Sequence, residues 1–259
     1  MSSTFRHSEI LEIARREGKV TVEGLAQRFG VTVQTIRRDL SDLADAGRLE
    51  RVHGGAVLPS GVANIGYEER RALNAGAKEA IGAACAAEIP ESASVFLAIG
   101  TTTESVARHL LRHRDLMVVT NNLNAANILL ANPDCEIAVA GGTLRRADGG
   151  LVGPLASRAV AEFKVDIAVI GCSALDADGD ILDFDIAEVE VSRTVLRQSR
   201  RRVLVADASK FHRSAPARIG SLADLDAIYT DGPLPAGLSR RCAGWQTELR
   251  VVAAGRAPA

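Results

Sequence analysis

The chain has 259 residues, 47% of them hydrophobic, which is enough to bury one large core or two smaller ones. With 31 basic and 32 acidic residues the net charge is −1, so any binding to nucleic acid or membranes must depend on a local patch. The four cysteines, Cys85, Cys135, Cys172 and Cys242, form no closely spaced pair, which argues against a zinc site or a disulfide framework.

The first 57 residues contain three short helical patterns. In the first two, apolar side chains recur at helical spacing, and Gly30 separates the second from the third. The third pattern begins after Thr32, a good N-cap, and has an apolar stripe of Ile36, Leu40 and Leu43. This succession of helix, turn and capped helix predicts a helix-turn-helix.

The outward face of the third helix is predicted to bind DNA. With the apolar stripe inward, Gln34, Arg37 and Arg38 point outward near the helix start, which such motifs insert into the major groove. Arginine can bond guanine and glutamine can bond adenine, while Thr35 and a second arginine can hold phosphates. The alternative is a solvated face on which the arginines pair with Asp39 or other carboxylates, since this region has nine basic and eight acidic residues.

A basic segment follows the third helix and runs into two glycines. Arg48, Arg51 and His53 come before the pair Gly54 and Gly55, and Gly47 is predicted to end the helix before them. The pattern is typical of a small β-hairpin wing that touches the DNA backbone or the minor groove.

Residues 31–56, VTVQTIRRDLSDLADAGRLERVHGGA, closely resemble the DNA-binding signature of the DeoR family of bacterial regulators. The resemblance continues through nearly the whole chain. It implies a winged helix-turn-helix domain over residues 1–57, whose partner is double-stranded operator DNA.

From about residue 76 onward, short apolar runs alternate with helical patterns. Most runs are continuously apolar, as strands covered on both faces must be. The alternation predicts a Rossmann-like, mainly parallel α/β domain over residues 76–259, and the Pro, Gly and polar residues of 58–75 suit a linker with about one helical turn. The predicted strands are Ser94–Ile99, Leu116–Thr120, Glu136–Ala140, Val165–Ile170, Arg202–Ala206 and Ala227–Thr230, and the predicted helices are Glu104–His113, Asn124–Ala131, Pro154–Phe163 and Ala187–Arg200.

Ligands of such sheets bind at the carboxyl ends of the strands, and two of the loops there suit an anion. Gly100 opens a helix after a strand, so backbone N–H groups and the hydroxyls of Thr101, Thr102 and Thr103 could hold a phosphate. A simple capped turn would have the same sequence. Lys210 follows a later strand, where its ammonium could neutralise phosphate, although a solvated lysine is the common case.

Two further loops carry polar or flexible residues. Asn121 has an amide that can bond hydroxyl groups, while a helix-capping role is nearly as plausible for the neighbouring asparagines. Gly141 and Gly142 allow close approach of the backbone, and Arg145 and Arg146 could meet an anion or another subunit. An ordinary exposed loop is the alternative.

A fifth segment places Asp183, Asp185 and Glu188 before or within the first turn of a helix. Their carboxylates could bind the hydroxyl groups of a polyol, or they could merely favour the positive end of the helix. Together with Lys210 they are also the residue types that proton transfer next to a carbonyl would use. A sugar-phosphate isomerase-like enzyme is therefore the alternative from another functional class.

These loops resemble those of DeoR-type sensor domains, which are similar to ribose-5-phosphate isomerase and related folds. The resemblance implies a sugar-phosphate effector with its phosphate on the Gly100–Thr103 loop and Lys210. It also implies hydroxyl contacts from Asn121, Asp185 and Glu188.

Four segments are most similar to a DeoR subgroup that responds to glycerol 3-phosphate: IGTTTESVA, VTNNLNAANIL, AGGTLRRADGGLVG and LDFDIAEVEVSR. The resemblance implies glycerol 3-phosphate as the effector, with another sugar or polyol phosphate as the alternative. One departure bears on this choice, because Ala98 stands where many family members have an aspartate.

The sequence thus predicts a DNA-binding transcriptional repressor whose operator binding is relieved by a phosphorylated metabolite. We expect no catalytic residues, metal or cofactor. The family resemblance implies a homo-oligomer, a dimer or tetramer whose symmetry matches paired half-sites. The N-terminus lacks the apolar core of a signal peptide and no segment approaches a membrane span, so a cytoplasmic protein with no membrane partner is expected.

Overall fold

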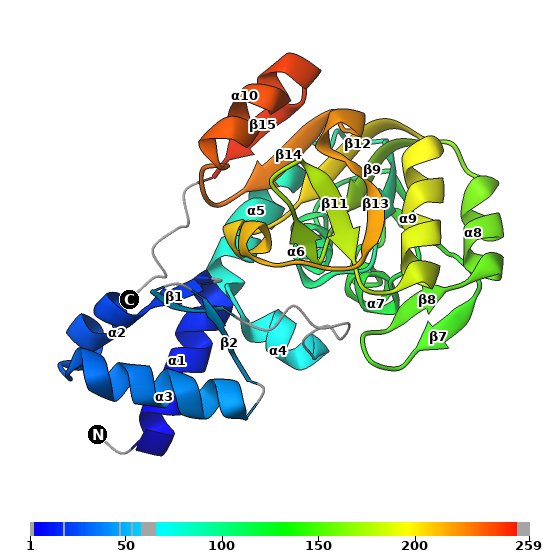
Figure 1. The fold of residues 1–259 in the computed structure, drawn as a ribbon. Helices are drawn as coiled ribbons and strands as arrows, with labels where there is room; N and C mark the ends of the chain where they lie inside the picture. Colours follow the sequence, from blue (N-terminus) through cyan, green and yellow to red (C-terminus); the bar gives the residue numbers. More distant parts are fainter. Residues whose placement is uncertain (1–2, 18, 47, 53, 58–65, 253–259) are drawn as a thin grey trace.

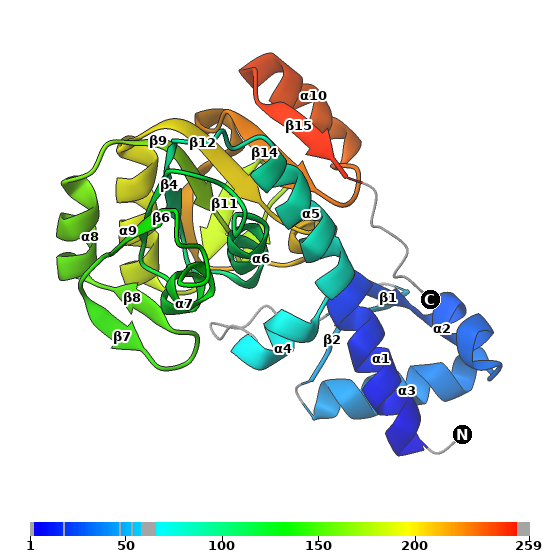
Figure 2. The ribbon, with the colours of Figure 1, turned by 180° about the vertical axis from the view of Figure 1, so that it is seen from behind.

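A computed structural model shows two structural units joined by a short helix (Figure 1, Figure 2). Gly47 and His53, for which the sequence predicts a helix end and a DNA contact, lie outside the described residues. No helix in the described part of the chain is long and apolar enough to cross a membrane. The structure describes residues 3–17, 19–46, 48–52, 54–57 and 66–252.

The N-terminal unit contains three helices and a small antiparallel sheet. Ile10, Leu25 and Ile36, one from each helix, are almost fully buried in a common core. The strand order is β1-β3-β2, so that β2 and β3 form the predicted hairpin and β1 flanks it. The elements are α1 (Ser3–Glu17), β1 (Lys19–Thr21), α2 (Val22–Phe29), α3 (Val33–Asp45), β2 (Glu50–Val52) and β3 (Gly55–Val57).

The second unit is built on a seven-stranded sheet with the order β15-β14-β12-β9-β4-β5-β6, in which every neighbouring pair is parallel. All six predicted strands are present, and the mainly parallel α/β fold is confirmed. The prediction misses one edge strand, β15. The strands are β4 (Ser94–Leu97), β5 (Leu116–Thr120), β6 (Cys135–Val139), β9 (Val165–Ile170), β12 (Ser199–Val205), β14 (Ala227–Thr230) and β15 (Glu248–Val251).

Helices cover both faces of this sheet, which explains why its strands are continuously apolar. Ile81, Val106 and Leu129 pack one face, and Val160 and Val195 pack the other. The first face is covered by α5 (Ala75–Ala87), α6 (Thr101–His109) and α7 (Leu123–Leu129), and the second by α8 (Pro154–Ala161), α9 (Ile186–Arg197) and α10 (Ala236–Trp245).

Several short elements were not predicted. A three-stranded antiparallel sheet with the order β10-β11-β13 adds to the second face, and β7 and β8 form a separate hairpin. The helix between the two units, α4 (Tyr67–Ala72), lies in the predicted linker. The other elements are β7 (Thr143–Arg145), β8 (Gly150–Val152), β10 (Ala174–Leu175), β11 (Asp180–Asp183), β13 (Ala217–Ser221) and two 3₁₀ helices, η1 (Ala208–His212) and η2 (Leu222–Asp224).

The sheet brings two of the predicted loops, those of Gly100 and Lys210, to one place. β12, β9 and β4 are adjacent in the sheet and parallel, so their carboxyl ends lie side by side. The segments that follow these strands begin at Ala98, Gly171 and Ala206. The Gly100 loop and Lys210, more than 100 residues apart in sequence, therefore meet at the same edge.

Candidate nucleic-acid interface and ligand cavity

The helix α3 presents the face that the sequence predicts. Thr32 is its N-cap, and the Thr32 Oγ1 accepts a hydrogen bond from the Thr35 backbone N–H at 3.2 Å. The apolar stripe is buried, while Gln34, Arg37 and Arg38 are exposed. Thr35 is half-buried, and its hydroxyl pairs with that of Thr32. The side chains expected to read DNA thus share one accessible face.

The buried Asp39 belongs to the scaffold beneath this face and pairs with neither neighbouring arginine. Its carboxylate accepts hydrogen bonds from Arg6 Nε at 2.7 Å and Arg6 Nη2 at 3.0 Å, and it contacts His7 at 3.1 Å. Burial alone would raise the pKa of Asp39, but the bonds from Arg6 and His7 outweigh burial and lower it. The ion pair therefore ties α3 to α1 and leaves Arg37 and Arg38 on the outside.

The wing is joined to α3 by side chains and to β1 by its backbone. Arg48 and Arg51 are exposed, and Arg51 Nη1 donates to Ser41 Oγ at 2.9 Å. A β-carbon on Gly55 would lie 1.9 Å from the carbonyl oxygen of Val20, so only glycine allows β3 to pair with β1 here. The hairpin and α3 consequently form one continuous exposed surface.

Beside a larger open cavity of about 550 Å³, a small cavity of about 20 Å³ lies at the carboxyl ends of β4, β9 and β12. We call this the inner cavity. Its lining comes from segments far apart in sequence, as the parallel topology requires. The lining residues are Arg70, Ile99, Gly100, Thr101, Thr102, Gly171, Cys172, Ser173, Asp183, Glu188, Val205 and Lys210.

Part of the lining of the inner cavity is electropositive. Gly100 is the N-cap of α6, and Thr101 and Thr102 form its buried first turn, so the partial positive charge of that helix end lies at the cavity. Burial lowers the pKa of Lys210, and the Asp207 carboxylate opposes this shift. An anion placed here would meet both a helix N-terminus and an ammonium group.

Two acidic residues, Asp183 and Glu188, also line the inner cavity. Burial together with the charge of Asp183 raises the pKa of Glu188 well above the ordinary range of a carboxyl. Glu188 is bonded to Arg145, which also donates to Asp148 Oδ1 at 2.9 Å and to Asp185 Oδ2 at 2.6 Å. The Arg145 guanidinium is therefore already shared among three carboxylates.

Other predicted site residues lie outside the inner cavity. The Thr103 hydroxyl is directed at the backbone at the start of its own helix, where Oγ1 donates to Ala98 O and Gly100 O, both at 2.7 Å. Asn121 donates to the Leu151 carbonyl at 3.1 Å. Asp185 caps α9 by accepting from the N–H groups of Ala187 and Glu188. It lines the neighbouring larger cavity, which we call the outer cavity and which is formed by residues of α4, the β7–β8 loop and residues 183–188. Gly141 and Gly142, in the loop before β7, are in neither lining.

Arg70 is a lining residue that sequence reasoning missed. It comes from α4, inside a segment whose composition suits a linker. No local pattern distinguishes it from the other charged residues of that helix. The contribution of Arg70 follows only from the way α4 packs against the second unit.

The sequence was compared with known protein families and with individual proteins. The model of the DeoR C-terminal sensor domain matches residues 73–232, and the model of the DeoR-like helix-turn-helix domain matches residues 6–62. The chain belongs to the DeoR family. The sequence-based identification is thus confirmed, and this DeoR-family protein is a DNA-binding transcriptional regulator.

Three similar DeoR-family proteins are named as repressors. The glycerol-3-phosphate regulon repressor of Escherichia coli (strain K12) is 43% identical over 238 residues, covering 92% of this chain and 94% of that protein. The repressor of the same name from Haemophilus influenzae is 41% identical and covers 96% of this chain and 97% of its own length. The transcriptional repressor CsqR of Escherichia coli (strain K12) is 40% identical and covers 94% of each.

The solved structures show only weak similarity to this chain. Ribose 5-phosphate isomerase from Plasmodium falciparum aligns over 52% of each chain at 12% identity, with a TM-score of 0.38. A similarity this low does not bear on activity.

Proposed function

We propose that this DeoR-family protein is a repressor that binds operator DNA through α3 and the wing and releases it on binding glycerol 3-phosphate in the inner cavity. The observation that carries the proposal is the lining of that cavity, which combines the N-terminus of α6 and Lys210 with the carboxyls of Asp183 and Glu188. A polyol phosphate has the matching chemistry, because it combines an anionic group with hydroxyl groups.

The N-terminus of α6 and Lys210 would bind the phosphate. The N–H groups of Thr101 and Thr102 and the ammonium of Lys210 provide donors at a site with little solvent, where charge-assisted hydrogen bonds are strongest. The carboxyls of Asp183 and Glu188 would bind the hydroxyls. We assign Asp185 a supporting role, because its oxygens are taken by the α9 backbone and by Arg145.

Relief of repression follows if the effector prefers the arrangement of the two units that does not bind DNA. A differential affinity of a few kcal/mol shifts such an equilibrium almost completely. We also propose that the protein works as a dimer or tetramer, so that two copies of α3 meet paired half-sites. A repressor of this kind acts in the cytoplasm and needs no catalytic residue, metal or cofactor.

The test is thermal unfolding of the purified protein with glycerol 3-phosphate, glycerol, inorganic phosphate and ribose 5-phosphate, because a ligand of the native state alone raises the midpoint. We expect the largest rise with glycerol 3-phosphate, together with release of an operator fragment selected with the same protein. A larger rise with ribose 5-phosphate would replace the effector, and the absence of any rise would contradict the sensor role.

A further inference from the structure

The helix α4, which connects the two units, contributes a side chain to the inner cavity. Arg70 reaches from α4 into this cavity and also lines the neighbouring outer cavity. Two contacts hold α4 on the second unit: Tyr67 donates to Glu104 Oε2 at 2.9 Å, and Arg70 Nη2 donates to Asp148 Oδ2 at 3.0 Å. Lys78 of α5 donates to the carbonyl oxygens of Arg70 and Leu73 and so closes the C-terminal end of α4.

The hydrogen-bonding capacity of Arg70 is only partly used. Its Nε is buried and has no hydrogen-bond partner among the residues that the structure describes. Leaving a buried donor of a charged group without a partner is costly, so such a group is expected to meet a ligand. A guanidinium has the fork geometry that binds phosphate oxygens in pairs.

Two further cations, Lys210 and Arg213, lie near enough to Arg70 to be affected by its charge. Arg213 also has a buried nitrogen, Nη1, without a partner in the described part of the chain. Burial lowers the pKa of both Lys210 and Arg213, and the charge of Arg70 lowers both further, while Asp207 opposes these shifts. The three cations thus repel one another, and an anion in the cavity that Arg70 and Lys210 line would relieve that repulsion.

We propose that Arg70 is a ligand of the effector phosphate, opposite Lys210 and the N-terminus of α6. This inference rests on the proposed function, because it adds a residue to the same effector site. It differs from that function in placing a phosphate ligand on the connecting helix. Effector binding then depends on the position of α4.

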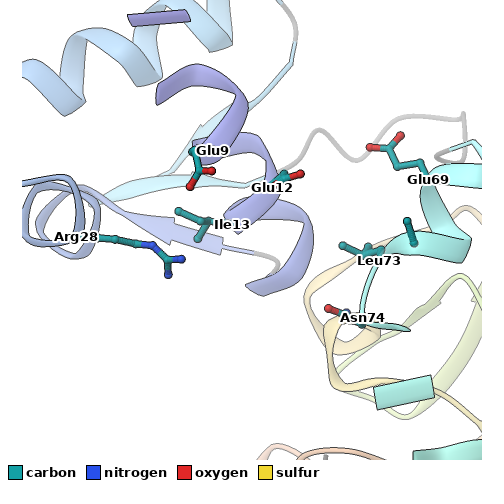
Figure 3. Close-up of a pocket in the computed structure, with 8 residues that line it drawn as sticks. Glu9, Glu12, Ile13, Arg28, Glu69, Leu73 and Asn74 are labelled. Carbon is teal, nitrogen blue, oxygen red and sulfur yellow. The ribbon is translucent and has the colours of Figure 1, made fainter. Parts of the chain in front are cut away.

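The opposite side of α4 faces the DNA-binding unit. Glu69, Ala72 and Leu73 line a third cavity together with Glu9, Glu12 and Ile13 of α1, as Figure 3 shows. In addition η1, which carries Lys210, packs directly against α1. Both cationic phosphate ligands, Arg70 and Lys210, are therefore on elements that adjoin the first helix of the DNA-binding unit. A phosphate that draws them together acts on the junction between the units.

The experiment compares Arg70→Gln with Arg71→Gln. Arg71 is the adjacent residue of α4, but its side chain is 64% exposed and its contact with Glu68 is a loose 3.9 Å. Binding of glycerol 3-phosphate and of inorganic phosphate is measured by calorimetry, after thermal unfolding has shown that each variant is folded. We expect Arg70→Gln to weaken both affinities at least about tenfold, as for loss of a charge-assisted hydrogen bond, and Arg71→Gln to change neither by more than about twofold.

A second pair of variants separates ligand binding from a structural role. Asp148→Asn removes the ion-pair partner of Arg70, so we expect it to retain phosphate binding, and Arg70→Lys should restore part of the affinity that Arg70→Gln loses. Unchanged phosphate binding by Arg70→Gln would overturn the inference, as would an equal loss in Asp148→Asn. If the wild-type protein binds neither probe, the proposed function fails as well. If it binds inorganic phosphate but not glycerol 3-phosphate, the proposed effector is wrong. The role of Arg70 is then tested by the affinity of each variant for inorganic phosphate.

Discussion

The DNA-binding surface and the inner cavity use charge in opposite ways. On the first, Arg37, Arg38 and Arg51 are exposed on a framework in which the buried ion pair of Arg6 and Asp39 lies beneath them. In the second, Lys210 and Glu188 are partly buried, and their pKa values are shifted toward neutral forms. An exposed cation attracts DNA without reorganisation, whereas a buried one needs a specific partner of opposite charge. A mutation on the DNA-binding surface should therefore leave effector binding intact, and a mutation in the inner cavity should leave DNA binding intact.

The largest effect is expected from Asp39→Ala. This change leaves the buried Arg6 without its carboxylate, and breaking one side of a buried pair costs about 3–5 kcal/mol. The N-terminal unit should unfold at lower temperature and lose operator binding, while glycerol 3-phosphate still stabilises the second unit. Calorimetric unfolding with and without that ligand measures both, and Asp42→Ala, an exposed change on the same helix, is the control.

The same pair predicts how acid affects the first unit. Because the pKa of Asp39 is lowered in the folded state, its contribution to stability is present above the ordinary carboxyl range and is lost as the pH falls through the lowered pKa. The difference between wild type and Asp39→Ala should therefore shrink in acid. A difference that stayed constant from neutral pH to pH 3 would contradict the assigned ionisation.

Lys210→Ala should separate sensing from DNA binding. Loss of a charge-assisted hydrogen bond costs about 1.5–3 kcal/mol, so effector affinity should fall by one to two orders of magnitude while operator affinity without effector is unchanged. Calorimetric titration and fluorescence anisotropy measure these two quantities. Lys164→Ala, which removes an exposed lysine from the same unit, is the matched control. Normal induction of the Lys210 variant would remove this residue from the site.

Arg38→Ala should have the reverse effect. A good arginine contact with a base pair is worth about 1–3 kcal/mol, so operator affinity should fall at a given salt concentration. The rise in unfolding midpoint caused by glycerol 3-phosphate should remain. Arg158→Ala, an exposed arginine on α8, controls for the loss of one positive charge. If the two variants bind the operator equally, α3 presents a different face to DNA.

The smallest effect concerns Glu188→Gln. The raised pKa of Glu188 means that its stabilising contribution is present at low pH and is lost as the pH rises through that raised value. The variant should therefore gain stability relative to wild type as the pH rises from 5 to 8.5. Urea unfolding at the two pH values measures this. A pH-independent difference would mean that Arg145 keeps Glu188 ionised.

The sequence predicts the DNA-binding surface better than the cavity, for a physical reason. On α3, the spacing of Ile36, Leu40 and Leu43 determines which side is buried, and the outward residues follow from helical geometry alone. The loops at the ends of β4 and β12 were also predictable, because parallel strands bring their carboxyl ends together. The extra antiparallel sheet was missed, since strands such as β10 (Ala174–Leu175) are too short to show a period.

The individual contacts of the cavity depend on tertiary packing. Nothing in the local sequence indicates that Arg145 would pair with three carboxylates. Nor does it indicate that the side chain of Arg70 would extend from a helix in the linker into the cavity. Asn121 and Thr103 illustrate the opposite case. Both have suitable chemistry at a suitable strand end, yet each directs a hydrogen bond to a backbone carbonyl.

The close approach of Gly55 to Val20 has a consequence for how related regulators diverge. Since no side chain is tolerated there, the hairpin keeps one position relative to β1 whatever the residues on its outer side become. Target preference can then change by replacement of a few exposed side chains, such as Gln34 or Arg38, without a compensating rearrangement of the wing. Gene duplication followed by such replacements would yield regulators that recognise different promoters on an unchanged scaffold.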